Sequence, residues 1–181
     1  MKESKQLDLN IFIPEPRDRS AVDDYILPLI REAIEDGAFH YPYYIEKNHT
    51  DKAGIVYTYL FSTCVAQKTF AVALDAATST PVGFESYLKS PFCEYFKTNP
   101  IYDGVLTFVS KSYRNQKVAS RLRHFLLKHG NFQSGDKFRF SVERNNKAGY
   151  LSVDKLAKEL NISMVETGVT YEGQLTHQLD I

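Results

Sequence analysis

The pattern of apolar and polar positions in the first part of the chain predicts a strand followed by a helix. Apolar and polar residues alternate over residues 7–13, with Phe12 as the exception, as expected for a half-buried strand. A helix is predicted from Ser20 to Gly37, because Ser20 with Asp23 three residues later is a helix-start signature and the apolar positions that follow have helical spacing. Pro28 lies inside this helix and is expected to kink or split it.

The next part of the chain predicts a helix and a hairpin. Residues 51–67 have apolar positions at helical spacing, and a helix is preferred although their Val and Tyr content also suits a strand. Two strands are predicted at 69–74 and 82–88, joined by a turn rich in Ala, Thr and Ser. The aromatic stretch 39–44 and the segment 90–100 are predicted to be irregular.

Residues 104–130 predict a strand, a tight turn and a helix. A short apolar run indicates the buried strand, and apolar residues at i, i+4, i+7 and i+8 then mark one face of the helix. The strand residues are Val105, Leu106, Phe108 and Val109, and the helix residues are Val118, Leu122, Phe125 and Leu126. Gly130 follows at the place where a helix end favours a left-handed residue.

The remaining residues predict a strand at 137–142, a helix at 143–160 and two strands at 164–171 and 174–179. The last two strands are expected to be joined by a turn at Glu172 and Gly173. The predicted order is therefore strand, two helices, three strands, helix, strand, helix and two strands.

Composition favours one globular domain over residues 1–181, because 43% of the residues are hydrophobic and the length supports a sizeable core. The sequence has no apolar run of the ~18–20 residues that a membrane span needs, and its start lacks the apolar region of a signal peptide. Two cysteines, Cys64 and Cys93, indicate no disulfide framework, and a cytoplasmic location is expected. The five histidines show no zinc-site spacing with them, so no metal is expected.

The charge is balanced overall, with 22 basic and 22 acidic residues, which argues against general nucleic-acid binding. Locally it is not balanced, because no Asp or Glu occurs between Gly104 and Gly135. The basic residues of this window are Lys111, Arg114, Lys117, Arg121, Arg123 and Lys128. Three of them lie near the expected helix start, where backbone N–H groups and the helix dipole favour an anion. The block indicates either a phosphate-bearing ligand or a solvated basic helix face.

The segment from Tyr113 to Ala119, Tyr-Arg-Asn-Gln-Lys-Val-Ala, resembles the acetyl-coenzyme A motif of the GCN5-related N-acetyltransferases, Arg/Gln-x-x-Gly-x-Gly/Ala. Arg114 and Ala119 match the ends of the motif, and Val109 matches the valine that usually precedes it. Residues 145–148 resemble the Asn-x-x-Ala at the start of the family's last helix. The order of elements resembles this fold over nearly the whole chain. The resemblance implies an α/β (α+β) protein with a mixed central sheet of about seven strands flanked by about four helices.

The chain departs from the motif at three positions. Lys117 stands where the family has its central glycine, Asn115 where many members have another glycine, and Lys111 where a proline is usual. The glycine allows the backbone to approach the pyrophosphate closely. A lysine keeps the N–H and adds charge, but its Cβ occupies space near the phosphate.

The resemblance implies acetyl-coenzyme A as cofactor and transfer of its acetyl group to a primary amine of a small molecule or a protein by direct attack. The implied cofactor-binding residues are Phe108, Val109, Arg114, Asn115, Gln116, Lys117, Val118, Ala119, Ser120, Arg121 and Asn145. The aromatic stretch 39–44 would then be a wall of the acceptor site or a lid over the core. A non-catalytic acyl-coenzyme A sensor or interaction module is the alternative, and both a monomer and a homodimer remain open. No membrane partner is expected.

Acetyl transfer needs a neutral amine, and an amine with a pKa of ~10.4 costs roughly 4–5 kcal/mol to deprotonate at pH 7. A carboxylate can accept this proton directly or through water. Asp103 occupies the position of the glutamate that does so in the resembled histone acetyltransferases, and Glu85 on the preceding strand is the alternative. Without such a role, Asp103 would be a turn residue before Gly104 and Glu85 an ordinary solvent-facing strand residue.

The leaving thiolate also needs a proton, because a thiol has a pKa of ~8.5. Many members of the resembled family supply it from a tyrosine seven residues after the asparagine of the last helix, and Ser152 holds that position here. Tyr150 lies two residues earlier, roughly 200° away around a helix. Tyr150 is therefore predicted either to donate this proton or simply to pack.

Overall fold

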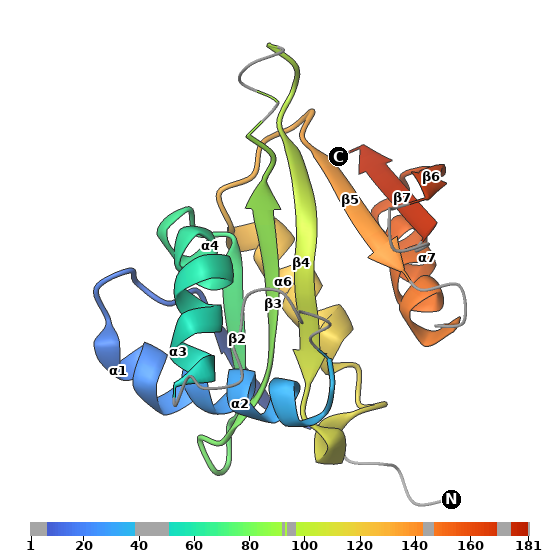
Figure 1. Cartoon of the computed structure of the whole chain (residues 1–181). Coiled ribbons are helices and arrows are strands. Elements are labelled where there is room, and N and C mark those ends of the chain that lie inside the picture. The colour runs from blue at the N-terminus through green and yellow to red at the C-terminus, as the bar shows by residue number, and fades with distance from the viewer. Residues whose placement is uncertain are drawn as a thin grey trace, which may run out of the picture. The chain divides into compact units, whose positions relative to one another are not determined.

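A computed structural model describes residues 7–38, 51–91, 93, 97–142, 147–169 and 175–180. In this part of the chain, seven strands form one mixed sheet in the order β1-β2-β3-β4-β5-β7-β6 (Figure 1). The strands are β1 (Leu9–Phe12), β2 (Phe70–Asp75), β3 (Pro81–Lys89), β4 (Ile101–Val109), β5 (Lys137–Val142), β6 (Met164–Val169) and β7 (Leu175–Asp180). β4 and β5 are parallel, whereas β1–β2, β2–β3, β5–β7 and β6–β7 are antiparallel. The predicted mixed sheet is therefore confirmed.

The helical segments whose ends lie within the described residues form four continuous helices and one short 3-10 turn, as the predicted fold class requires. The first helix consists of α1 (Arg19–Ala21), η1 (Val22–Ile26) and α2 (Leu27–Glu35), and the second of α3 (Lys52–Val56), η2 (Tyr57–Phe61) and α4 (Ser62–Ala66). The others are α6 (Val118–His129) and α7 (Lys147–Leu160), and the 3-10 turn is η3 (Lys111–Tyr113). Residues 51–67, for which a strand was the alternative, are thus helical.

Pro28 does not split the first helix. The π-helical segment η1 precedes it, and the N–H of Leu27 donates to the carbonyl of Val22 five residues back. Proline lacks an N–H, so the hydrogen-bond ladder is interrupted in any case at this point, and the helix continues to Glu35. The cap also differs from the predicted one, because the Asp18 carboxylate accepts from the N–H of Ala21 at 3.0 Å.

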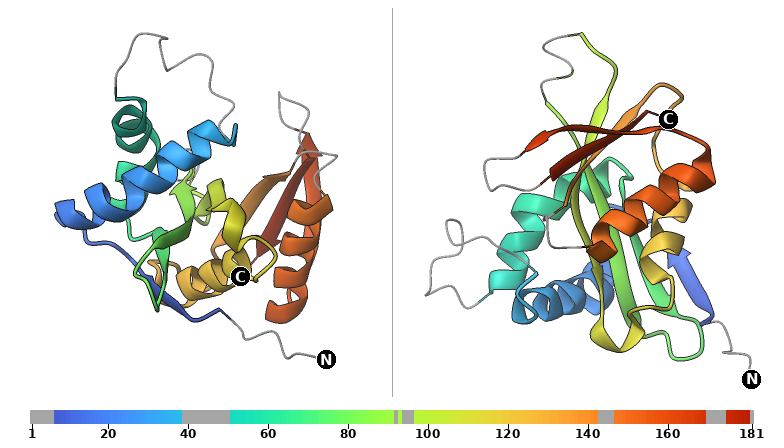
Figure 2. Two further views of the ribbon diagram at one scale, coloured as in Figure 1. Left: turned by 90° about the horizontal axis from the view of Figure 1, so that it is seen from below. Right: turned by 90° about the vertical axis from the view of Figure 1, so that its right-hand side faces the viewer.

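The chain divides into two compact units, Met1–Ser86 with Leu106–Gly130 and Tyr87–Val105 with Asn131–Ile181. In the first unit, the helices α2 and α6 lie on opposite faces of β2 and β3 (Figure 2). Its core contains ring contacts with centroids 5.3–6.0 Å apart among Phe61, Phe70, Phe84 and Phe108. The single-domain prediction for residues 1–181 stays a prediction.

The second unit has its own aromatic core. Edge-to-face and stacked contacts with centroids 4.7–5.9 Å apart join Tyr87, Tyr102, Phe132, Phe138 and Phe140. β4 pairs with β5 from Ile101 to Asp103, opposite Lys137 to Arg139.

Several local predictions need correction or fall outside the described residues. Gly130 ends α6 in an extended conformation (φ −74°, ψ 174°) and not in the expected left-handed one. β4 begins at Ile101, three residues before the predicted strand, so Asp103 lies within the strand and not in a turn. The aromatic stretch 39–44 and the turn at 172–173 lie outside the described residues. No helix in the described part of the chain has both the length and the apolar character that crossing a bilayer requires.

Candidate functional site

The predicted strand, turn and helix at 104–130 are present as the end of β4, η3 and α6. Ser110 donates its N–H to the carbonyl of Val82 at 3.0 Å and so keeps the end of β4 beside β3. β3 passes very close to β4 here, because a Cβ added at Gly83 would lie 2.6 Å from the carbonyl oxygen of Phe108. The chain then turns through η3 and enters α6 at Val118. We call residues 110–117 the β4–α6 loop.

Two residues of the β4–α6 loop have a left-handed backbone although neither is glycine. Asn115 has φ 64° and Lys117 has φ 63°. Asparagine tolerates this conformation comparatively well, but for other residues a left-handed backbone costs about 1–3 kcal/mol and persists only where the surroundings impose it. Lys117 stands where the resembled motif has its central glycine, and Asn115 where many members have another glycine. The loop therefore keeps a backbone conformation typical of glycine with other side chains.

Lys117 is also the N-cap residue of α6, and it makes no side-chain capping hydrogen bond. The first turn of an α-helix leaves its N–H groups without partners inside the helix, and the helix dipole adds partial positive charge there. These N–H groups belong to Val118, Ala119 and Ser120, and the exposed Lys117 side chain stands next to them. This end of α6 can thus receive an anion such as a phosphate.

Arg114, the motif arginine, already has partners. Its Nε donates to the carbonyl of Val109 at 2.9 Å, its Nη2 is ion-paired with Asp36, and its guanidinium lies 5.9 Å from the centroid of the Phe108 ring. The Nζ of Lys111 lies 2.6 Å from the other carboxylate oxygen of Asp36. Hydrogen bonds from Lys111 and Arg114 lower the pKa of Asp36 below its ordinary value of 3.8.

Two further carboxylates hold the β4–α6 loop. Glu32 accepts from the hydroxyl of Ser110 at 2.6 Å and from the N–H of Lys111 at 3.3 Å. Asp75 accepts from the hydroxyl of Tyr113 at 3.3 Å, and burial together with this carboxylate raises the pKa of Tyr113. We call Glu32, Asp36 and Asp75 the carboxylate clamp. Sequence reasoning missed all three, because they precede their loop partners by 38 to 79 residues.

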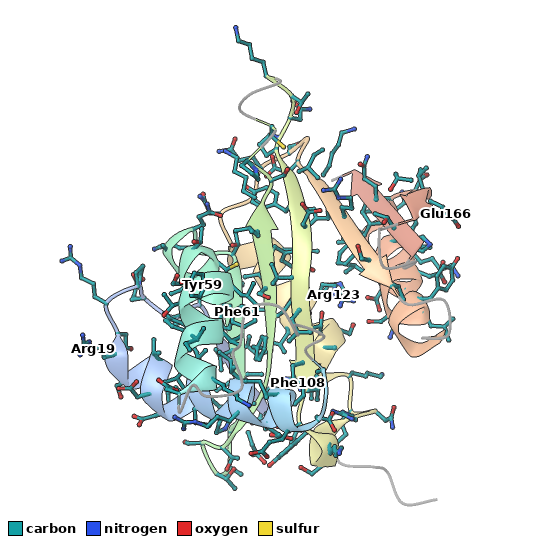
Figure 3. The ribbon with its side chains drawn as sticks, in the orientation of Figure 1. Arg19, Tyr59, Phe61, Phe108, Arg123 and Glu166 are labelled. Atoms are coloured by element: carbon teal, nitrogen blue, oxygen red, sulfur yellow. The ribbon has the colours of Figure 1, made fainter. Side chains whose placement is uncertain are left out.

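Arg121 and Arg123 do not contribute to an exposed basic face. Arg121 donates to the carbonyl of Leu7 at 2.6 Å. Arg123, labelled in Figure 3, is buried and ion-paired with the equally buried Glu85, with Nε–Oε1 at 3.2 Å and Nη2–Oε2 at 3.4 Å. The same Nη2 donates to the hydroxyl of Thr107 at 3.1 Å. The interpretation of Glu85 as a solvent-facing residue is therefore wrong.

Asp103 lies in the second unit and faces Arg139 across the parallel β4–β5 pair. Arg139 donates to the Asp103 carboxylate from both Nε and Nη2, the latter at 2.8 Å, and this hydrogen bonding to Asp103 raises the pKa of Arg139. The two side chains are 37% and 40% exposed, so solvent and a ligand can reach the pair. A base at Asp103 would have to exchange a contact with Arg139 for one with the amine.

The two candidate proton donors lie on α7. The Tyr150 side chain packs edge-on against the buried His177, with ring centroids 5.3 Å apart, and remains 41% exposed. Ser152 is half-buried, and Asn145 lies outside the described residues. Among the residues with described placement, no group of three or more His, Cys, Asp or Glu could hold a metal ion.

Comparison with solved structures identifies the fold. No protein-family model and no curated protein matches the sequence. The diaminobutyrate acetyltransferase of Paenibacillus lautus, solved with L-2,4-diaminobutyric acid and coenzyme A, is 19% identical, with a TM-score of 0.58 over 96% of this chain and 95% of that one. The NatC complex bound to a Gag peptide and coenzyme A gives 14% identity and a TM-score of 0.66 over 97% and 99% of the two chains.

A GNAT-family acetyltransferase of Listeria monocytogenes gives 15% identity and a TM-score of 0.58 over 97% and 96% of the two chains. The protein thus has the fold of the GCN5-related N-acetyltransferases over nearly its full length.

Proposed function

We propose that the protein binds acetyl-coenzyme A at the β4–α6 loop and transfers the acetyl group to a primary amine. The observation that carries the proposal is the left-handed backbone of Lys117, directly before α6, where the family's cofactor motif has its central glycine. Asn115, where many members have another glycine, is also left-handed. Two of the similar structures contain coenzyme A. Their other ligands, a diamino acid and a peptide, support a small molecule and a protein as the two acceptor classes.

The hydrogen-bond donors at the end of the β4–α6 loop are suited to binding a pyrophosphate. The N–H groups of Val118, Ala119 and Ser120 would receive its oxygens, and the Lys117 ammonium would add a charge beside them. Arg114 is less suited to direct contact, because Asp36 and the carbonyl of Val109 already hold its guanidinium. The cofactor would supply the thioester, and the protein's task is then to orient it and to accept the proton of the amine.

Asp103 is the proposed base. Its carboxylate is partly exposed, whereas Glu85 is in the interior with both oxygens bound to Arg123. The acceptor nitrogen forms the new bond to the acetyl carbon, the carbon–sulfur bond breaks, and the amine proton passes to the carboxylate. Tyr150 and Ser152 remain the candidates for protonating the thiolate.

Isothermal titration with acetyl-coenzyme A and a thermal-shift series test the cofactor site. At about a hundredfold excess over its dissociation constant, the ligand should stabilise the fold by about 2.7 kcal/mol. Lys117→Glu should lose most of the affinity, since it reverses the charge at the N-terminus of α6. Lys128→Glu makes the same change in the last turn of that helix, where the side chain is exposed, and should bind like the parent. No melting shift of the parent at millimolar ligand would refute the site.

A non-catalytic acyl-coenzyme A sensor is the second candidate, favoured by one observation: both candidate bases are ion-paired with an arginine. Release of free coenzyme A thiol separates the two functions. The enzyme should release thiol with at least one amine in a panel of polyamines, amino acids, aminoglycosides and peptides. A parent protein that binds the cofactor but releases no thiol with the whole panel would be a sensor.

A further inference from the structure

The carboxylate clamp contacts four residues of the β4–α6 loop. Glu32 binds Ser110 and the backbone of Lys111, Asp36 binds the side chains of Lys111 and Arg114, and Asp75 binds Tyr113. Both Glu32 and Asp36 come from the C-terminal end of α2, which lies beside η3 (Figure 1). The contacts end at the residue directly before the left-handed Asn115.

We propose that the carboxylate clamp is a positioning device that holds the β4–α6 loop in its left-handed conformation and so keeps the N-terminus of α6 ready for the cofactor. The inference rests on the proposed function. Asp36 is its central residue, and it acts through the loop and not by touching the cofactor.

The backbone of the loop shows why such a device is needed. Two left-handed residues that are not glycine lie two positions apart, and Lys117 in particular is disfavoured unless its surroundings impose this conformation. In many members of the resembled motif, glycine adopts these angles at no steric cost. Here the Cβ atoms of Asn115 and Lys117 disfavour the left-handed backbone angles. Contacts from outside the loop therefore have to offset this free-energy cost.

The charges indicate that the role of Asp36 is geometric. Two cations, Lys111 and Arg114, are balanced by two carboxylates, Glu32 and Asp36, so this cluster adds no net positive charge to attract a phosphate. Asp36 is also the C-cap of α2, where the helix dipole is negative and α2 has no basic residue in its last turn. A carboxylate is unfavourable at that end of a helix. The ion pairs of Asp36 with Lys111 and Arg114 offset this cost. They also connect the C-terminal end of α2 to the β4–α6 loop.

The test is a double-mutant cycle between Asp36→Asn and Lys117→Gly. Asp36→Asn keeps the shape of the side chain but loses both ion pairs, and it should weaken acetyl-coenzyme A binding by about fivefold or more, the factor that corresponds to the strain of one such residue. In the Lys117→Gly background, the same substitution should weaken binding by less than about twofold, since glycine needs no clamp. Asp154→Asn, which breaks the exposed ion pair with Lys158 (2.7 Å), is the matched control and should leave binding unchanged.

Unfolding in urea provides a second measurement that needs no cofactor. Lys117→Gly should raise the folded-to-unfolded ratio about fivefold when Asp36 is present and by less than about twofold in the Asp36→Asn background, where the loop can relax. If the parent binds no acetyl-coenzyme A, the proposed function fails and this measurement still decides on the clamp. Equal effects of Lys117→Gly in both backgrounds would overturn the inference, as would tighter binding by Asp36→Asn, which would make Asp36 a competitor of the phosphate.

Discussion

Replacing Arg123 with methionine is expected to destabilise the fold by about 3–5 kcal/mol, because it leaves the Glu85 carboxylate in the interior without its cation. The side chains of Glu85 and Arg123 are only 1% and 5% exposed, so water cannot take over the role of the guanidinium. Thr107 also loses the donor at 3.1 Å from its hydroxyl, which adds about 1 kcal/mol.

The intact Glu85–Arg123 pair contributes far less to the free energy of unfolding than the cost of Arg123→Met implies. At the observed N–O distance of 3.2 Å and an effective dielectric constant of about 20, the Coulomb attraction is about 5 kcal/mol. Removing each ion from water costs several kcal/mol, so attraction and desolvation nearly cancel. The double variant Glu85→Met/Arg123→Met, which removes both charges and keeps similar volumes, should therefore be within about 2 kcal/mol of the parent.

Urea unfolding at pH 7 measures both effects. Arg123→Met should cost about 4–6 kcal/mol in total, so with an m-value of about 2 kcal/mol/M it should lower the midpoint by about 2–3 M. Lys155→Met breaks the Lys155–Glu159 pair, which has a similar N–O distance of 3.4 Å but is exposed, and should cost at most about 1 kcal/mol. A double variant as unstable as Arg123→Met alone would refute the argument, because the loss would then come from packing and not from an unpaired charge.

Two further predictions concern other carboxylates. Asp103→Asn should lower turnover by about 10²–10⁴-fold while leaving the affinity for acetyl-coenzyme A nearly unchanged. Steady-state kinetics measure the turnover, and titration measures the affinity. A fully active Asp103→Asn together with an inactive Glu85→Gln would show that Glu85 is the base. Asp36 has a pKa lowered from 3.8 by Lys111 and Arg114, so its stabilising contribution is complete above that value and is lost as the pH falls through the lower folded value. The stability difference between the parent and Asp36→Asn should thus be present at pH 7 and shrink as the pH falls below 3.8; a constant difference would contradict this.

The order of elements could be predicted because each change of period in the sequence corresponds to a change of structure. The apolar run before Val109 and the helical spacing from Val118 locate the strand–turn–helix, and Gly37 ends α2 with φ 70° as its position suggests. The left-handed backbone of Lys117 could not be derived from local propensity, since lysine disfavours it. Only the resemblance to a glycine motif pointed to that position.

The charge partners could not be predicted either. Arg123 looked like one cation of a basic block, and its burial depends on Glu85, which lies 38 residues away. The contacts of Asp36 with the loop depend in the same way on how the chain folds back. Pairings between distant residues leave no periodic signal, so the local sequence pattern identified the β4–α6 loop but not the groups that hold it.

The π segments in the two helices of the first unit bear on insertions and deletions. In each helix the step between successive buried residues lengthens to five at the π segment, from Ala21 to Ile26 and from Val56 to Phe61. A residue added to a regular α-helix would rotate everything after it by about 100° and turn the apolar face away from the core. A π segment absorbs that residue locally. Each helix could therefore differ in length by one residue between related chains while the same side chains stay buried.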